Sequence, residues 1–227
     1  MKIGILFAMN EELNALKKHL KINKTNKIYE LEFFEGTIEN TECVLVDCGI
    51  GKVNAARCTQ VLIDNYDLDY IFNIGVAGGV SNDLQVGDIV VGEKLVQHDF
   101  DITAFNHEKG YIPNLGGKFI DSCSELIELS KKSSLPVKYG VIASGDIFCT
   151  DVNMSNKINS KFNALCVEME SAAVAQVCYL CKVPFLIIRS ISDVPNNENN
   201  ITFDEFLLEA SDKVADYLVS ILSKIEN

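Results

Sequence analysis

The sequence is poor in arginine and histidine, and this scarcity restricts the ligands that the protein can bind. It contains two arginines, Arg57 and Arg189, and three histidines among 227 residues. Acidic residues outnumber lysine and arginine by 32 to 20, so the net charge is −12. Because nucleic acids require a basic surface and phosphate clamps favour arginine, we expect no nucleic-acid partner and favour a largely uncharged ligand.

Long uncharged hydrophobic runs are also missing. The apolar stretch after Lys2 ends at Met9 and is followed by Glu11 and Glu12, so it is too short for a signal peptide or a membrane span. We therefore expect a cytoplasmic protein with no membrane partner. The eight cysteines lie mostly in apolar runs, which favours free, buried thiols in a reducing compartment.

Metal ligands are too sparse to predict a metal site. The pair Cys178 and Cys181 lacks a second pair or a nearby histidine, so a packing role is favoured. His98, Asp99 and Asp101 lie close together, but a structural hydrogen-bonding role is the better interpretation. We expect neither a metal nor a cofactor.

What the sequence does contain is a regular alternation of apolar, β-branched runs with amphipathic stretches. No linker divides them, which predicts a single α/β domain over residues 1–227, with a central mixed, mostly parallel twisted sheet and helices on both faces. Strands are expected at 2–8, 27–35, 42–48, 70–74, 86–97, 137–144, 164–168 and 184–191. Helices are expected at 10–20, 52–65, 122–132, 170–181 and 203–225. Asn10 is the expected cap of the first helix and 202–205 form a capping box for the last, while 102–120 is a long irregular stretch.

Two glycine clusters fail as phosphate-binding motifs. Gly49–Asn54 lacks the third glycine of the dinucleotide fingerprint and the first glycine of a Walker loop, and Gly75–Gly79 has the wrong spacing. Each cluster is interpreted either as a tight turn after a strand or as a place where the backbone approaches a small ligand closely.

Three acidic residues follow predicted strands, namely Glu12, Glu170 and Asp193. If those strands are parallel, their carboxyl ends meet at one edge of the sheet, where α/β proteins bind ligands. A single acid in such a place is usually a cap or a solvated loop residue. Three together favour a common site.

Seven segments, in order along nearly the whole chain, resemble the 5′-methylthioadenosine/S-adenosylhomocysteine nucleosidases, a family in the purine nucleoside phosphorylase and uridine phosphorylase superfamily. The segments are Ala8–Glu12, Gly49–Lys52, Ala77–Gly79, Val86–Ile89, Ser144–Phe148, Val167–Glu170 and Arg189–Asp193. The resemblance implies a nucleoside phosphorylase-like fold and hydrolysis of the N-glycosidic bond of 5′-methylthioadenosine and S-adenosylhomocysteine, with 5′-deoxyadenosine a further candidate.

The resemblance also implies catalytic roles that suit an oxocarbenium-like transition state. Glu12 is the expected base for water, in a first helical turn where the dipole favours the ionised form. Asp193 is the expected acid for N7 of adenine, which needs burial and hydrogen bonding, with Ser192 nearby, to raise its pKa. Glu170 is expected to bind the ribose hydroxyls, and Arg189 to help Glu12 position the water.

The resemblance also implies a substrate pocket, which contains more residues than the catalytic set. Met169 packs on the sugar, the Phe148 ring stacks on adenine, and the backbone of Phe148 and Cys149 adjoins its edge. Met9, Ile50 and Phe203 line the 5′-alkylthio pocket, although a core role for Met9 and Ile50 is also open. A partner subunit in a homodimer adds Ile102, Phe105 and Pro113. Further substrate-binding residues are Val76, Ala77, Gly78, Glu168 and Ser192.

One departure from the family pattern is Val76, where the family often has serine. The loss of this hydroxyl puts the rate and the preferred 5′ substituent in doubt, but not the activity. Two alternatives are a phosphate-dependent nucleoside phosphorylase and a nucleoside-binding or storage protein without turnover. The scarcity of arginine opposes the first, and the presence of all three acids opposes the second.

Overall fold

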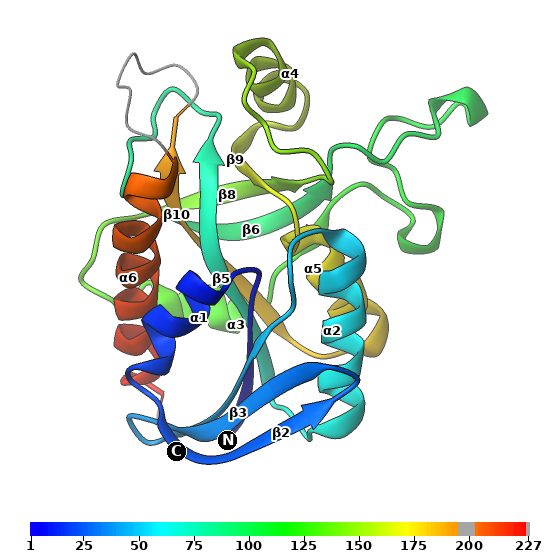
Figure 1. Cartoon of the computed structure of the whole chain (residues 1–227). Coiled ribbons are helices and arrows are strands. Elements are labelled where there is room, and N and C mark those ends of the chain that lie inside the picture. The colour runs from blue at the N-terminus through cyan, green and yellow to red at the C-terminus, as the bar shows by residue number, and fades with distance from the viewer. Residues whose placement is uncertain (195–202, 226–227) are drawn as a thin grey trace.

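The computed structural model describes residues 1–194 and 203–225, and of 203–205 the backbone only; it contains a ten-stranded mixed sheet between helices (Figure 1). In chain order the elements are β1 (Lys2–Phe7), α1 (Asn10–Lys17), β2 (Lys21–Ile28), β3 (Leu31–Ile38), β4 (Thr41–Asp47), α2 (Lys52–Asn65), β5 (Tyr70–Gly79), β6 (Ile89–Gln97), η1 (Thr103–Phe105), η2 (Pro113–Leu115), β7 (Ile120–Asp121), α3 (Ser124–Ser130), β8 (Val137–Ser144), α4 (Val152–Phe162), β9 (Ala164–Glu168), α5 (Ser171–Cys181), β10 (Phe185–Asp193) and α6 (Phe203–Leu222). The predicted α/β class with a mixed sheet is confirmed.

The strand β5 is the centre of the sheet because it pairs with three other strands. It runs parallel to β1 and to β10, while its last residues, Gly78 and Gly79, pair with β9 in antiparallel orientation. Since β10 pairs with β6, β6 with β8 and β8 with β9, these five strands close into a ring. Five of the ten pairings described are parallel, which is half rather than the predicted majority.

Helices cover both faces of the sheet, as predicted. The helices α2 and α5 pack together on one face, where Leu62 and Val174 are fully buried in one hydrophobic core. The helices α1 and α6 pack on the other face, where Leu16 and Leu218 are fully buried in a second core (Figure 1). Within the described residues, no helix combines the length and the apolar character needed to cross a membrane.

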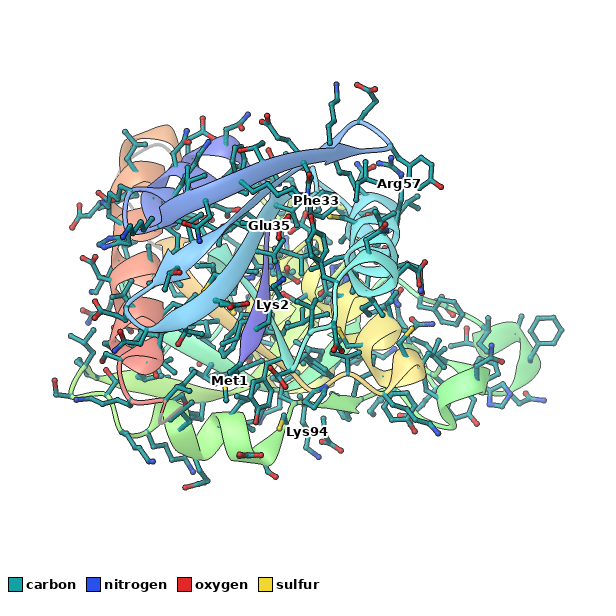
Figure 2. All side chains as sticks on the ribbon, turned by 90° about the horizontal axis from the view of Figure 1, so that it is seen from below. Met1, Lys2, Phe33, Glu35, Arg57 and Lys94 are labelled. Atoms are coloured by element: carbon teal, nitrogen blue, oxygen red, sulfur yellow. The ribbon has the colours of Figure 1, made fainter. Side chains whose placement is uncertain are left out.

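The outermost strand of the sheet, β2, differs from prediction. Residues 21–28 form β2 and residues 31–38 form β3, so the strand predicted at 27–35 is wrong: a turn at Tyr29 and Glu30 divides it. The sequence of β2 is polar and its side chains are mostly exposed, so it has no hydrophobic pattern to announce a strand. It forms because it pairs, as an antiparallel edge strand, with β3, whose Phe33 is buried (Figure 2).

Two features of the helices differ from prediction, and a third lies outside the described residues. The helix α4 was not predicted, although Asp151 caps its N-terminus by accepting a hydrogen bond from the Asn153 N–H. The cap of α1 is Met9 rather than Asn10, which is already helical. The capping box at 202–205 and the Phe203 side chain lie outside the described residues, although α6 begins at 203 as predicted.

Candidate active site

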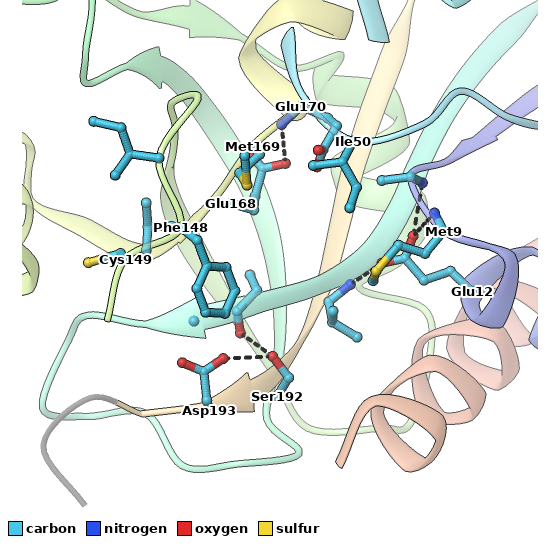
Figure 3. Close-up of a pocket in the computed structure, with 16 residues that line it drawn as sticks. Met9, Glu12, Ile50, Phe148, Cys149, Glu168, Met169, Glu170, Ser192 and Asp193 are labelled. Carbon is cyan, nitrogen blue, oxygen red and sulfur yellow. Dashed lines mark hydrogen bonds between the residues drawn. The ribbon is translucent and has the colours of Figure 1, made fainter. Parts of the chain in front are cut away.

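A pocket opens at the carboxyl end of β5, and thirteen of the predicted site residues line it (Figure 3). The described lining consists of Ala8, Met9, Glu12, Ile50, Val76, Ala77, Gly78, Ile147, Phe148, Cys149, Val167, Glu168, Met169, Glu170, Ser192 and Asp193. Ala8, Ile147 and Val167 were not predicted, yet each is the direct neighbour of a predicted residue. The lining combines many apolar side chains with four carboxyl groups and contains no lysine, arginine or histidine.

Glu12 is held rigidly by backbone donors on one wall of the pocket. Its Oε2 accepts hydrogen bonds from the N–H groups of Ala8 at 2.9 Å and Met9 at 3.2 Å, and its Oε1 accepts one from Val76 at 2.9 Å. Burial raises the pKa of Glu12, while Arg189 and the three N–H donors lower it without cancelling the rise. The predicted dipole effect is therefore outweighed by burial, and Glu12 becomes a stronger base than an exposed glutamate.

The second glycine cluster, Gly75–Gly79, belongs to strand β5 and is not a turn. β5 continues through Gly79, because Gly75 and its neighbours pair with β10. A Cβ at Gly75 would lie 2.1 Å from Arg189 Nη1 and 2.4 Å from Glu12 Oε1. The absence of a side chain thus makes room for two charged side chains of the protein itself, rather than for a turn.

Arg189 lies beneath the pocket and is absent from its described lining. It is fully buried, and its Nη2 donates to Asn73 Oδ1 at 2.5 Å, to Glu168 Oε2 at 2.7 Å and to Ser171 Oγ at 2.9 Å. Burial lowers the pKa of Arg189, but the surrounding carboxylates raise it overall, so it stays charged. Its charge also lowers the pKa of Glu12, and its expected part in positioning water together with Glu12 stays a prediction.

Glu168 is the anionic partner of Arg189 and the most completely hydrogen-bonded acid of the site. Its Oε2 also accepts from the N–H groups of Glu170 and Ser171 and from the Ser171 hydroxyl, while its Oε1 accepts from the Ser144 hydroxyl. We call Glu168, Arg189, Asn73, Ser171 and Ser144 the floor network. Its charges and polar groups are paired with one another, as buried ions require.

Glu170 has a different environment, although only one residue separates it from Glu168. Its Oε1 accepts a hydrogen bond from the Gly51 N–H at 2.8 Å, and its Oε2 lies 4.0 Å from Arg189 Nη2. Burial and the neighbouring Glu168 raise the pKa of Glu170 to about 8, against the opposing effect of Arg189. We call Glu12, Glu170 and Asp193 the wall acids.

A β-bulge brings Ser192 and Asp193 to the pocket together. Ile191 pairs with Ala77 and Asp193 pairs with Gly78, so Ser192 is an extra residue in β10. In a regular strand, adjacent side chains point to opposite faces, whereas the bulge allows both to line the pocket. Asp193 is therefore the last residue of the strand rather than a residue after it.

Burial raises the pKa of Asp193, as a proton donor requires. The Ser192 hydroxyl donates to Asp193 Oδ1 at 2.8 Å and lowers this pKa, because the bond stabilises the ionised form. Burial thus acts in the predicted direction and the hydrogen bond in the opposite one. Gly78 leaves space beside the carboxyl, since a Cβ there would lie 3.2 Å from Asp193 Oδ2.

The wall acids meet in one pocket for a reason other than the one predicted. β10 runs parallel to β5 but β9 runs antiparallel to it, so the three strands are not all parallel as the prediction assumed. The convergence occurs at Gly78, which pairs with Val167 of β9 on one side and with Asp193 of β10 on the other. Together with the Val76 N–H bound to Glu12, the end of β5 is the common support of all three acids.

The apolar side of the pocket rests on α6. Val76 is buried in a small cluster with Leu207 and Ala210, and the partly buried Met9 packs against it. Ile50 is 52% exposed, so its alternative assignment to the core is wrong. Figure 3 shows the Phe148 ring pointing into the pocket near Asp193.

The residues expected to act in a partner subunit lie away from this pocket. Ile102, Phe105 and Pro113 belong to a segment that extends from the body of the chain (Figure 1) and line no part of the described pocket. Phe105 is 75% exposed, Pro113 is exposed and Ile102 is half-buried. The segment therefore presents apolar side chains outward.

Asp99 belongs to a hydrogen-bonded network rather than to a metal cluster. It accepts from Lys52 Nζ at 2.6 Å and from the Asp146 N–H at 3.0 Å. Burial raises the pKa of Asp99, but these donors lower it overall. Among the residues that the structure describes, no group of three or more His, Cys, Asp or Glu side chains is arranged to hold a metal ion.

Known proteins resemble the chain along its whole length. Residues 2–223 match the model of the phosphorylase superfamily. The 5′-methylthioadenosine/S-adenosylhomocysteine nucleosidase of Bacillus pumilus is 40% identical over 232 residues, with 100% of both sequences covered. The structure of the same-named enzyme from S. pneumoniae with the transition-state inhibitor MT-ImmA is 38% identical, with a TM-score of 0.93 and 100% of both chains covered. A Helicobacter pylori mutant of this type, with asparagine replacing an aspartate and 5′-methylthioadenosine in the active site, is 35% identical, with a TM-score of 0.93 and 99% of both chains covered.

Proposed function

The chain belongs to the phosphorylase superfamily and, within it, to the 5′-methylthioadenosine/S-adenosylhomocysteine nucleosidases, and from this premise we propose how its pocket hydrolyses an adenine nucleoside. The proposed substrates are 5′-methylthioadenosine and S-adenosylhomocysteine, with 5′-deoxyadenosine as a further candidate. The products are adenine and a 5-substituted ribose. No cofactor takes part in this proposal.

The observation that carries hydrolysis over phosphorolysis is the charge of the pocket. Its described lining has four carboxyl groups and no cationic side chain. Both arginines are engaged elsewhere, Arg189 in the floor network and Arg57 on α2, where it donates to the Tyr29 carbonyl at the turn between β2 and β3 (Figure 2). A phosphate ion would meet repulsion without a compensating cationic side chain in the described lining, whereas water is neutral.

The proposed chemistry assigns a separate role to each wall acid. Glu12 removes a proton from a water molecule while the oxygen of that water forms a bond to the anomeric carbon of the ribose. The bond from that carbon to N9 of adenine breaks, and its electrons pass to the base. Asp193 protonates N7, so that adenine leaves as a neutral molecule. The raised pKa values of Glu12 and Asp193 support both proton transfers near neutral pH.

Glu170 is proposed to bind the ribose hydroxyls and thereby to orient the sugar. The Gly51 N–H holds one of its oxygens, which fixes the carboxyl at the pocket edge. Met169 is proposed to pack on the sugar, and Phe148 to stack on adenine with the backbone of Cys149 beside the base. Such a mixture of a few polar groups with apolar walls suits a nucleoside.

We propose a homodimer, in which Ile102, Phe105 and Pro113 of one subunit complete the 5′-alkylthio pocket of the other beside Met9 and Ile50. The exposure of Phe105 supports this proposal, because burial of a large apolar side chain at an interface is favourable.

A cytoplasmic location is also proposed. Its support is that all eight cysteines are free, as is typical of a reducing compartment.

The decisive experiment is an assay of adenine release in buffer freed of phosphate and again with added phosphate. We expect the same rate in both, with free 5-substituted ribose rather than its 1-phosphate as the second product. Strict dependence on phosphate would refute hydrolysis. Tight binding of 5′-methylthioadenosine without any release of adenine would instead favour a nucleoside-binding or storage protein.

A further inference from the structure

Three charged residues from distant segments form a closed ring of hydrogen bonds. The Lys52 N–H donates to Asp146 Oδ1 at 2.8 Å, and the Asp146 N–H donates to Asp99 Oδ2 at 3.0 Å. The ring closes through Lys52 Nζ, which donates to Asp99 Oδ1 at 2.6 Å. We call these three residues the Lys52 ring. None of them lines the described pocket.

The ring also completes the N-terminus of α2. Gly51 is the cap residue of this helix and has no side chain to accept a hydrogen bond from the first turn. Asp146, 94 positions away in sequence, supplies that acceptor and adds a negative charge at the positive end of the helix dipole. A Cβ at Gly51 would lie 3.2 Å from Asp146 Oδ1, so glycine permits this approach.

The segments joined by the ring carry two separate parts of the pocket lining (Figure 3). Ile50 lies two residues before Lys52, and Phe148 lies two residues after Asp146. Between Ile50 and Lys52, the Gly51 N–H holds Glu170. The ring therefore links the loop after β4 to the loop after β8, and Asp99, in the segment after β6, bridges the two.

We propose that the Lys52 ring positions Ile50 and Phe148 around the bound nucleoside, so that Lys52, Asp99 and Asp146 are positioning residues for substrate binding. This inference rests on the proposed nucleoside site. Phe148 is 56% exposed and Ile50 is 52% exposed, so neither is fixed by burial in the core. The hydrogen bonds of the ring add rigidity to the two loops that carry these side chains.

The charges of the ring make the proposal testable. Lys52 and Asp99 are 16% and 18% exposed, so water screens their interaction only in part. Removal of the Lys52 charge leaves Asp99 without the cation that it accepts from, while the Asp146 N–H still links Asp99 to a second acidic residue, Asp146. Their repulsion should push the two loops apart, and neutralising Asp99 should then relieve it.

The experiment compares Lys52→Met with the double variant Lys52→Met/Asp99→Asn in steady-state assays of adenine release. We expect Lys52→Met to raise KM about tenfold with kcat changed less than about twofold, because the ring joins the loops that carry Ile50 and Phe148 and contains none of the reacting groups. The double variant should have a lower KM than Lys52→Met, since the repulsion is gone. The matched control is Lys94→Met, which removes a more exposed ion pair with Asp121 and should leave both constants unchanged.

Several results would overturn the proposal. An unchanged KM in Lys52→Met excludes a positioning role, and so does a further rise of KM in the double variant. Loss of kcat with KM unchanged would assign the ring to the chemical step instead. Thermal unfolding of each variant identifies any loss that comes from failure to fold. Failure of the proposed function would be visible separately, as an inactive unsubstituted protein.

Discussion

The floor network and the wall acids lie side by side and differ in how their charges are satisfied. In the floor network, Glu168 receives hydrogen bonds from Arg189, Ser144, Ser171 and the backbone. Each wall acid is also buried or largely buried, but within the described part of the chain none forms a hydrogen-bonded ion pair. Burial consequently raises the pKa of Glu12, Glu170 and Asp193.

This difference separates scaffold from chemistry. A buried carboxylate that is bonded to a guanidinium keeps its charge and its position, so it cannot exchange protons easily. A buried carboxyl without such a partner has a proton affinity closer to neutral pH and can accept or donate a proton. Variants that remove a charge should therefore affect activity at the wall and stability at the floor.

The largest effect is expected at the wall, for Asp193→Asn. The amide keeps the shape of the carboxyl but cannot protonate adenine, so kcat should fall about 1,000-fold, within the range that general acid catalysis contributes. Calorimetric titration with 5′-methylthioadenosine should still detect binding. The control Asp121→Asn changes an exposed aspartate and should retain full activity. A variant that keeps more than a tenth of the rate would remove Asp193 from the role of acid.

The second expected effect concerns the floor. Glu168→Gln leaves the Arg189 charge buried without its anion, which should lower the free energy of unfolding by about 3 kcal/mol, measured by urea denaturation. The double variant Glu168→Gln/Arg189→Met should be more stable than Glu168→Gln, because the unpaired charge is gone. Equal stability of Glu168→Gln and the unsubstituted protein would contradict the distinction between floor and wall.

Much of the sheet could be predicted from sequence, because apolar runs mark buried strands directly. The strand at 137–144 and the helix at 52–65 have the predicted bounds. The edge strand β2 could not be found in this way, since pairing with β3 and not burial holds it. The cap at Asp151 was an available signal for α4.

The residues that line the site were largely predicted, but the way in which the fold brings them together was not. The three wall acids line one pocket, yet the argument from parallel strands fails for Glu170, since β9 is antiparallel to β5. No local sequence pattern predicts the β-bulge at Ser192 or the space that Gly75 leaves for the side chains of Arg189 and Glu12. These features depend on contacts between residues more than 60 positions apart, which a single sequence does not display.

The smallest expected effect tests the wall by pH. Because the pKa of Glu170 is raised to about 8 from an ordinary 4.5, the folded protein holds a proton here that the unfolded chain releases. This contribution to stability is complete below about pH 4.5 and is lost as the pH rises through about 8. Glu170→Gln has no such proton, so its melting temperature relative to the unsubstituted protein should rise from pH 5 to pH 8.5, by a few degrees.

The difference between the two proteins is informative because every other titrating group is common to both and largely cancels. Glu168→Gln is the contrasting variant, since it removes the hydrogen-bonded partner of Arg189 in the floor network rather than a wall acid. Its melting temperature should stay below that of the unsubstituted protein throughout, without the same upward trend. A flat difference for Glu170→Gln between pH 5 and pH 8.5 would mean that Glu170 is already ionised at pH 5, and that the wall is as fully paired as the floor.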